Sequence, residues 1–227
     1  MAQHYTILFD LDGTLVDTAP DLMRAHNHVM KKFGYPTKST EEIRNLVGQG
    51  AGAMLGRSIW GQAKKEFSKV QDDKIKKEMV NDFVDFYGKN IVNESTLIKG
   101  VKEFLIWAKQ NKISMGVCTN KQEHLAVDLL KKIGIYDFFE YVAGHNTFEY
   151  CKPDPRHLTS VVEILGGDIK KTLMIGDSET DANAAQSAGI PVILLEDGYT
   201  EKNTTEIYHN HLVKDFVGIE KIVLKYL

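Results

Sequence analysis

The chain has 227 residues, of which 43% are hydrophobic and 26% are charged, and its formal net charge is −3 at pH 7. This length is sufficient for one well-buried α/β core together with an accessory domain. Acidic and basic residues are interspersed along the chain, so we expect neither a nucleic-acid partner nor attachment to an anionic membrane.

The first four residues lead directly into an apolar run, without the charged and apolar leader of a secretory signal or a membrane span. The two cysteines, Cys118 and Cys151, are too few for a disulfide framework and have no close spacing, and we interpret both as bystander thiols. A reducing compartment is therefore expected, and we predict a cytoplasmic location.

The first predicted strand, Tyr5 to Phe9, is a short apolar run with a turn signal behind it. Asp10 ends it, and Asp12 follows two residues later. Alternate residues of a strand share a face, so an extended path carries both carboxylates beyond the carboxyl edge of the sheet, where open α/β folds bind ligands. Two charges about 5 Å apart repel by roughly 3 kcal/mol, which requires a cation such as Mg²⁺ or a shared proton. An ordinary Asx turn is the alternative interpretation.

Residues 17–93 change in character from strand-like runs to helical ones, and we predict that they form an inserted α-helical cap domain. Apolar residues recur at helical spacing between Asp21 and Phe33 and again between Asp72 and Tyr87, as expected of helices that pack on a core. Residues 1–16 and 94–227 are then predicted to form the α/β core domain.

A glycine-rich turn, Val47 to Gly52, lies between these helices. Glycine lets backbone amides approach an anionic substrate, so Gly48 and Gly50 are candidate substrate-binding residues. Arg44, just upstream, is a candidate partner for a substrate carboxylate. The alternative is a plain flexible connector with Arg44 on the surface.

From about residue 95 onward, helical and strand-like segments alternate. Helices are predicted at 101–110, 123–133, 155–165, 180–188 and 217–226, and strands at 113–117, 141–143, 171–175 and 191–195. Repeated βα units predict a parallel, doubly wound sheet, and the cap is then an insertion after its first strand. Residues 196–200 are expected to form an exposed loop of unassigned role, and residues 209–211 a surface loop.

Three polar motifs follow in the second half of the chain. Thr119 and Asn120 come after the strand at 113–117 and supply a hydroxyl and an amide, which donate hydrogen bonds to phosphate oxygens. Lys152 lies in a stretch with two prolines, where a helix cannot continue, and a rigidly placed ammonium can clamp a phosphate. Asp177 and Asp181 are spaced i and i+4, so one turn of helix places both carboxylates on one face.

In their order and context, these motifs and the opening aspartates resemble those of the haloacid dehalogenase superfamily, in its phosphatase branch, and the chain looks like a phosphoglycolate phosphatase. The resemblance covers nearly the whole chain and implies a Rossmann-like core. It also implies that Asp10 is the nucleophile and that Asp12 is the general acid and base. Thr119 and Lys152 match the phosphate-binding positions of the family, and we expect Asn120 to act with them.

The same resemblance implies a Mg²⁺ cofactor. Asp177 matches the acidic motif that completes the metal site, with Asp181 as an outer or supporting ligand, and Asp10 and Asp12 are the other expected ligands. The implied reaction is the hydrolysis of a small phosphate monoester, with 2-phosphoglycolate as the first choice of substrate. Asp10 attacks phosphorus while Asp12 protonates the leaving alcohol, and Asp12 then activates the water that hydrolyses the aspartyl-phosphate.

Other activities stay open at this stage. Asp12 argues against dehalogenases and against phosphonate-cleaving enzymes, which lack this aspartate. Phosphomutases of the β-phosphoglucomutase type carry a histidine where this chain has Leu22, which disfavours a sugar phosphomutase, and a pyrophosphatase or a nucleotidase is a further alternative. A phospho-acceptor signalling module is disfavoured because receiver domains place the acceptor on a middle strand of a much shorter chain. We expect a small phosphate ester as the only partner and leave the oligomeric state open.

Overall fold

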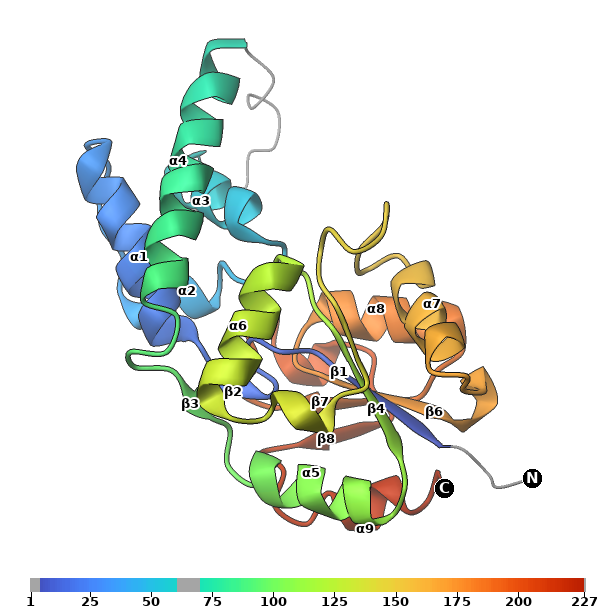
Figure 1. The fold of residues 1–227 in the computed structure, drawn as a ribbon. Helices are drawn as coiled ribbons and strands as arrows, with labels where there is room; N and C mark the ends of the chain where they lie inside the picture. The colour runs from blue at the N-terminus through green and yellow to red at the C-terminus, as the bar shows by residue number, and fades with distance from the viewer. Residues whose placement is uncertain (1–4, 61–69, 227) are drawn as a thin grey trace.

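The structure, a computed structural model, describes residues 5–60 and 70–226. The core of this described part is a six-stranded sheet in which all neighbouring strands are parallel. In spatial order the strands are β5 (Tyr141–Ala143), β4 (Ser114–Cys118), β1 (Thr6–Phe9), β6 (Thr172–Gly176), β7 (Val192–Leu195) and β8 (His211–Val213). The first strand of the chain therefore lies near the middle of the sheet (Figure 1).

The register of β1 with its two neighbours positions the loops that follow them. Phe9 is paired with Val117 of β4 on one side and with Ile175 of β6 on the other. β4 and β6 each continue for one more residue, so all three strands end at the same carboxyl edge, where parallel sheets bind ligands. Asp10 directly follows β1, and its N–H still donates to the carbonyl oxygen of Ile175 at 2.9 Å.

Successive residues of β1 are buried in different apolar clusters, because helices cover both faces of the sheet. Phe9 packs in a cluster with residues of α5 (Val101–Gln110), α6 (Glu123–Ile133) and α9 (Glu220–Val223). Leu8 packs in a second cluster with residues of α7 (Arg156–Ile164) and α8 (Glu179–Ala188). The sheet is thus doubly wound, as the repeated βα units predict.

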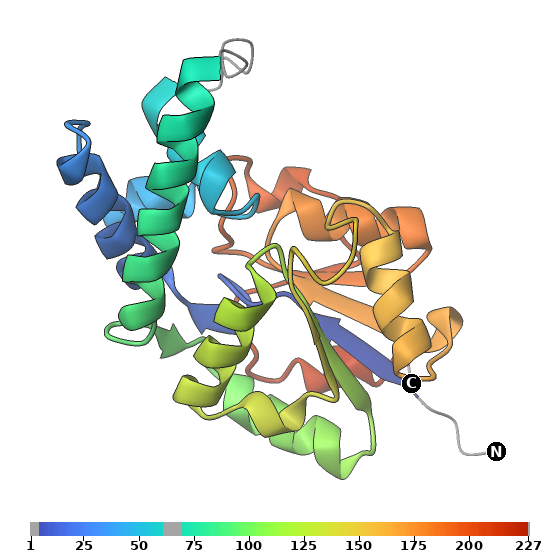
Figure 2. The same ribbon diagram turned by 45° about the horizontal axis from the view of Figure 1, so that its top comes forward.

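A helical insertion interrupts the core after β1. The chain leaves through β2 (Val16–Asp17), forms α1 (Ala19–Lys32), α2 (Thr40–Arg44), α3 (Ala51–Trp60) and α4 (Val70–Lys89), and returns through β3 (Thr96–Leu97). β2 and β3 pair with each other in an antiparallel sheet of their own. In both views the helices α1 to α4 stand to one side of the main sheet, away from α7 and α8 (Figures 1 and 2).

The predicted fold class, a doubly wound parallel sheet with an inserted helical cap, is confirmed. The helices α1 to α4 all fall within the predicted cap, residues 17–93, and the assignment of the boundaries themselves stays a prediction. Within residues 5–60 and 70–226, no helix has the length and apolar character needed to cross a membrane.

Two predictions at the C-terminal end are wrong. The terminal helix, predicted over 217–226, is limited to Glu220–Val223, with turns on both sides and an exposed Val217. His211, predicted to lie in a surface loop, begins the edge strand β8, which the Asn210 side chain ties to β7 by accepting from the N–H of Val192 at 2.8 Å. A helix of four residues is too short for periodicity to reveal, and β8 begins with a histidine within a polar run, unlike the equally short β5, which the sequence predicts.

Asp21, in the first helix of the insertion, binds the segment through which the chain returns to the core. Its side chain is buried, and its Oδ2 accepts hydrogen bonds from the N–H groups of residues 93, 94 and 95, at 2.9 to 3.0 Å, and from the Ser95 hydroxyl at 2.7 Å. Arg24 contacts the other oxygen at 3.3 Å. One carboxylate therefore binds three successive backbone groups just before β3.

We expect Asp21→Ala to lower the free energy of unfolding by about 3 kcal/mol, because it leaves several partly or fully buried donors without an acceptor. Urea denaturation monitored by circular dichroism measures this change. Asp128→Ala, which removes a partly exposed i,i+4 pair with Lys132 in α6, is the matched control and should cost less than about 1 kcal/mol. Equal losses in the two variants would contradict the anchoring role of Asp21.

Candidate active site

A cavity of about 400 Å³ lies between the carboxyl edge of the sheet and the helices of the insertion. The core contributes charged and polar groups to its wall, and the insertion contributes backbone and mainly apolar side chains. The lining includes Asp10, Asp12, Thr119, Asn120 and Lys121 from the core, and Gly48, Gly50, Met54, Phe83 and Tyr87 from the insertion. A polar floor under an apolar roof is typical of a site for a small ligand with a charged group.

Asp10 is almost completely buried at the floor of this cavity, with 6% of its surface exposed. One of its oxygens, Oδ1, lies 2.8 Å from the ammonium of Lys152, which is also 2.6 Å from Oδ1 of Asp181. Burial raises the pKa of Asp10 to about 6 against the opposing effect of Lys152. For Lys152, burial alone would lower the pKa, but the two aspartates outweigh it and raise the pKa.

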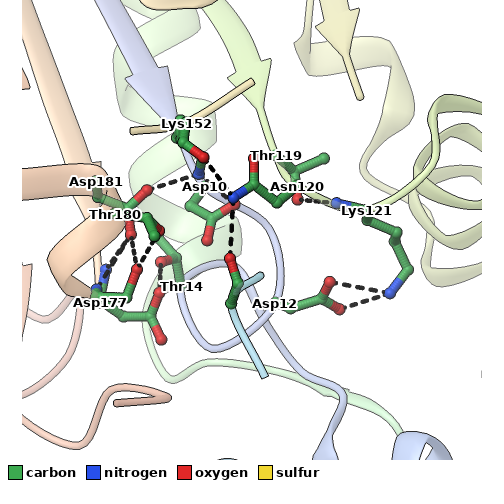
Figure 3. A network of polar contacts seen from close by, with 12 residues as sticks. Asp10, Asp12, Thr14, Thr119, Asn120, Lys121, Lys152, Asp177, Thr180 and Asp181 are labelled. Carbon is green, nitrogen blue, oxygen red and sulfur yellow. Dashed lines mark hydrogen bonds and ion pairs between the residues drawn. The ribbon is translucent and has the colours of Figure 1, made fainter. Parts of the chain in front are cut away.

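Asp177 and Asp181 are held by hydrogen bonds of the loops around them. Asp181 is part of a capping box at the start of α8, in which its Oδ2 accepts from the N–H and the hydroxyl of Ser178. Asp177 accepts from the Thr14 hydroxyl at 3.1 Å and from the N–H of Tyr199 at 2.6 Å. Both carboxylates are therefore fixed in position before any ligand binds (Figure 3).

Asp10, Asp177 and Asp181 form a cluster that could hold a metal ion. Each offers one oxygen, and the three oxygens lie within 4.8 Å of one another. When all three buried carboxylates are ionised, they and the ammonium of Lys152 leave an excess of two negative charges. Burial, together with the neighbouring aspartates, raises the pKa of Asp177. Carboxylate oxygens and an excess of two negative charges fit a hard divalent cation.

Asp12 lines the same cavity but has different partners. Its two oxygens accept from the ammonium of Lys121 at 2.8 and 2.9 Å, and the hydroxyl of Thr18 donates to Oδ1 at 2.6 Å. The Lys121 ammonium also lies 4.4 Å from the centroid of the Tyr87 ring. Figure 3 shows this pair apart from the aspartates around Lys152, so the Asp12 carboxylate is not brought into the cluster, and its role as a metal ligand stays a prediction.

Of the predicted phosphate-binding residues, Thr119 and Asn120 line the cavity, and Lys152 lies behind this lining against Asp10. Thr119 directly follows β4 and accepts from the N–H of Lys121 through its hydroxyl oxygen at 3.2 Å. The amide nitrogen of Asn120 donates to the carbonyl oxygens of Lys152 at 3.0 Å and of Gly48 at 2.9 Å. Asn120 thus connects the loop of Lys152 to the turn of the insertion, and its contact with phosphate stays a prediction.

Of the three candidate substrate-binding residues in the insertion, two line the cavity and one does not. Gly48 and Gly50 line the cavity in a turn that ends where α3 begins, at Ala51. Arg44 lies outside the lining, because its guanidinium pairs with Asp17 at 2.7 Å. The structure therefore supports contact between a ligand and the turn, and gives Arg44 a partner within the protein instead.

Lys121, Thr14 and Tyr199 are site residues that the sequence predictions missed. Lys121 follows Thr119 and Asn120 directly, and Thr14 belongs to the opening motif, so both had a signal in their position. The prediction of an exposed loop at 196–200 is wrong for Tyr199, which is buried against Asp177. The only feature of the local sequence that indicates burial of Tyr199 is that it is an aromatic residue within a polar run. Cys118 is a buried bystander, since burial raises the pKa of its thiol.

Residues 7–195 match the family model described as haloacid dehalogenase-like hydrolase. The chain is 36% identical over 210 residues to a protein named phosphoglycolate phosphatase from Mesorhizobium japonicum, covering 92% of this chain and 90% of the relative. It is also 36% identical over 223 residues to a protein of the same name from Agrobacterium fabrum, covering 96% and 94% of the two chains.

Solved structures agree with these sequence matches. A crystal structure described as a predicted phosphoglycolate phosphatase from Haemophilus somnus superposes with a TM-score of 0.88 at 31% identity, covering 98% of this chain and 99% of that one. A β-phosphoglucomutase from Clostridium difficile superposes with a TM-score of 0.79 at 23% identity, covering 99% and 97%, which shows a shared fold.

If the aspartate cluster binds a divalent cation, protons should compete with the cation at Asp10 below a pH of about 6. We therefore expect Mg²⁺ to raise the melting temperature strongly at about pH 7.5 and progressively less as the pH falls below about 6. Thermal denaturation over a Mg²⁺ titration at several pH values measures this effect.

Asp177→Asn should remove most of the Mg²⁺ effect on the melting temperature, because it takes one charge out of the cluster. The matched control is Asp85→Asn, which alters an exposed carboxylate of α4 and should leave the Mg²⁺ effect unchanged. A rise in melting temperature that is independent of pH, or that is the same in both variants, would place the cation elsewhere.

Proposed function

The chain belongs to the haloacid dehalogenase-like hydrolases, and we propose that it hydrolyses 2-phosphoglycolate in a Mg²⁺-dependent reaction through a phosphorylated Asp10. It is a phosphoric monoester hydrolase, as its relatives named phosphoglycolate phosphatase indicate. The observation that carries the proposal is the buried Asp10 in the cavity wall, which pairs with Lys152 and clusters with Asp177 and Asp181.

Asp10 is the proposed nucleophile. Its carboxylate lies in the cavity wall, and its position is fixed by the backbone bond to β6 and by the ion pair with Lys152. An oxygen of Asp10 forms the new bond to phosphorus while the bond from phosphorus to the alcohol oxygen breaks. Water then cleaves the aspartyl-phosphate, which releases phosphate and restores the carboxylate.

Asp12 is the proposed proton donor and acceptor in these two steps. It lies in the same cavity wall as Asp10 but outside the cluster of three carboxylates, so it can exchange a proton with the leaving oxygen and later with water. In this structure both of its oxygens contact Lys121. The proposed step therefore requires Asp12 to exchange that contact for one with the leaving oxygen.

Lys152 and Thr119 are placed to neutralise charge on the phosphoryl oxygens. The Lys152 ammonium is buried 2.8 Å from the nucleophile, and Thr119 lies in the adjacent cavity wall. A Mg²⁺ ion held by Asp10, Asp177 and Asp181 would supply Lewis-acid stabilisation of the same charge. Because uncatalysed hydrolysis of phosphate monoesters is extremely slow, electrostatic stabilisation of this kind carries most of the catalysis.

The turn of the insertion is the proposed binding site for the carboxylate of 2-phosphoglycolate. Gly48 and Gly50 line the cavity, and backbone N–H groups of such a turn can approach an anion closely. Leu22 also lines the cavity, at the position where a phosphomutase of the β-phosphoglucomutase type would need a histidine. This apolar residue cannot transfer a proton, which favours hydrolysis over mutase chemistry.

A panel of phosphate monoesters, assayed for phosphate release with Mg²⁺, tests substrate and nucleophile together. We expect 2-phosphoglycolate to give the highest kcat/KM, and Asp10→Asn to lower kcat by at least about 10³-fold, because the covalent step is lost. Asp85→Asn serves as the control for the loss of one aspartate. A higher kcat/KM for another ester would overturn the substrate assignment, and substantial turnover by Asp10→Asn would overturn the nucleophile.

Asp12→Asn tests the general acid and base. We expect kcat to fall by about 10²- to 10⁴-fold, because proton transfer is lost in both steps. For an aryl phosphate with a good leaving group, the first step needs little acid catalysis, so phosphorylated protein should accumulate. Intact-mass spectrometry after rapid acid quenching detects this species. A variant that loses activity equally for all leaving groups and never accumulates phosphoprotein would contradict the assignment.

A further inference from the structure

Tyr199 joins two parts of the site that are far apart in the sequence. Its backbone N–H donates a hydrogen bond of 2.6 Å to Oδ2 of Asp177, one of the three clustered carboxylates. At the other end of the residue, the phenol hydroxyl donates to Oδ1 of Asp17 at 2.5 Å and accepts from the N–H of Ala19 at 2.9 Å. This residue, only 2% exposed, therefore connects a candidate metal ligand with the point where the chain enters the insertion.

The insertion is attached to Tyr199 by further contacts. Asp17 ends β2 in the two-stranded connection, and its Oδ2 accepts from Arg44, the last residue of α2, at 2.7 Å. The Arg44 guanidinium also lies over the Tyr199 ring, 5.3 Å from its centroid. Two residues after Tyr199, Glu201 pairs with Arg57 of α3 at 3.6 Å.

Tyr199, Asp177 and the opening loop are closely packed against one another. A Cβ atom at Gly13, where φ is +82°, would lie 2.2 Å from Oδ2 of Asp177 and 2.8 Å from Cγ of Tyr199. A Cβ atom at Gly198 would lie 1.9 Å from the carbonyl oxygen of Asp177. Only glycine fits at either position, so the opening loop, Asp177 and the loop of Tyr199 are in direct contact and cannot shift independently.

We propose that Tyr199 is a positioning residue that couples the orientation of the helical insertion to the geometry of the metal-binding carboxylates. While the contacts with Asp17 and Arg44 are intact, the backbone of Tyr199 holds Asp177 in the orientation that meets the cation. Movement of the insertion that breaks these contacts releases Tyr199 and weakens the metal site. The inference rests on the proposed function for the identity of the cation, and it is independent of which ester is hydrolysed.

Tyr199→Phe tests the coupling, because it removes the hydroxyl and keeps the ring, the stack with Arg44 and the backbone bond to Asp177. We expect the dissociation constant of Mg²⁺, measured by calorimetry on the full chain without substrate, to rise by about 3- to 10-fold. This is less than the roughly 10- to 100-fold typical of losing an outer-shell partner outright. The matched control is Tyr208→Phe, which alters an exposed tyrosine and should leave the Mg²⁺ affinity unchanged.

Asp17→Ala removes the other partner of the same hydrogen bond, between Asp17 and the Tyr199 hydroxyl, and leaves Tyr199 unaltered. It should also weaken Mg²⁺ binding, although Asp17 is not one of the clustered carboxylates. Wild-type Mg²⁺ affinity in both folded variants would overturn the coupling alone. Absence of Mg²⁺ binding by the unaltered chain would overturn both the proposed cofactor and this inference, whereas failure to hydrolyse 2-phosphoglycolate with normal Mg²⁺ binding would affect only the proposed substrate.

Hydrogen exchange provides a second readout that a general loss of stability would not reproduce. Coupling is reciprocal, so bound Mg²⁺ should strengthen the hydrogen bond from the Ala19 N–H to the Tyr199 hydroxyl. We expect Mg²⁺ to slow exchange of the Ala19 amide in the unaltered chain and to have little effect on it in Tyr199→Phe. The same protection in both proteins would overturn the proposal.

Discussion

Lys152 lies between the carboxylates of Asp10 and Asp181, at 2.8 and 2.6 Å, and Asp177 completes the group. One ammonium cannot neutralise three buried carboxylates, and burial, together with the neighbouring aspartates, raises the pKa values of Asp10 and Asp177. Hydrogen-bond donors of Thr14, Ser178 and Tyr199 reduce the repulsion between the carboxylates without removing it. A divalent cation would balance the two excess negative charges of the ionised cluster, and it would also attract the phosphoryl oxygens of an ester.

Such a cluster is possible because parallel strands end at one edge of the sheet. β1 pairs with β4 and β6 in a register that places Asp10 level with Cys118 and Gly176, one residue before Thr119 and Asp177. This arrangement could be predicted from the sequence, because each of these polar residues directly follows an apolar run. The helices α5 and α6 also begin and end at the predicted residues, since their apolar spacing agrees with their burial against the sheet.

Contacts between distant segments could not be predicted in this way. The partners Asp12 and Lys121 are 109 residues apart, and Asp17 and Tyr199 are 182 apart. Each pairing depends on how the insertion and the loops fold over the sheet, which no local pattern encodes. For the same reason Arg44, whose charge fits a substrate carboxylate equally well, could not be assigned to its protein partner before the structure was known.

The groups proposed to catalyse the reaction lie in the core, and those proposed to choose the substrate lie in the insertion. Every group proposed to act on phosphorus belongs to the core, whereas the turn with Gly48 and Gly50 lines the cavity from the insertion. The insertion enters and leaves the core through β2 and β3, a connection that favours movement of its helices as a unit. Arg44 acts at this connection and outside the cavity lining, so its replacement should alter the movement of the insertion. Substrate preference should instead change through substitutions in the turn.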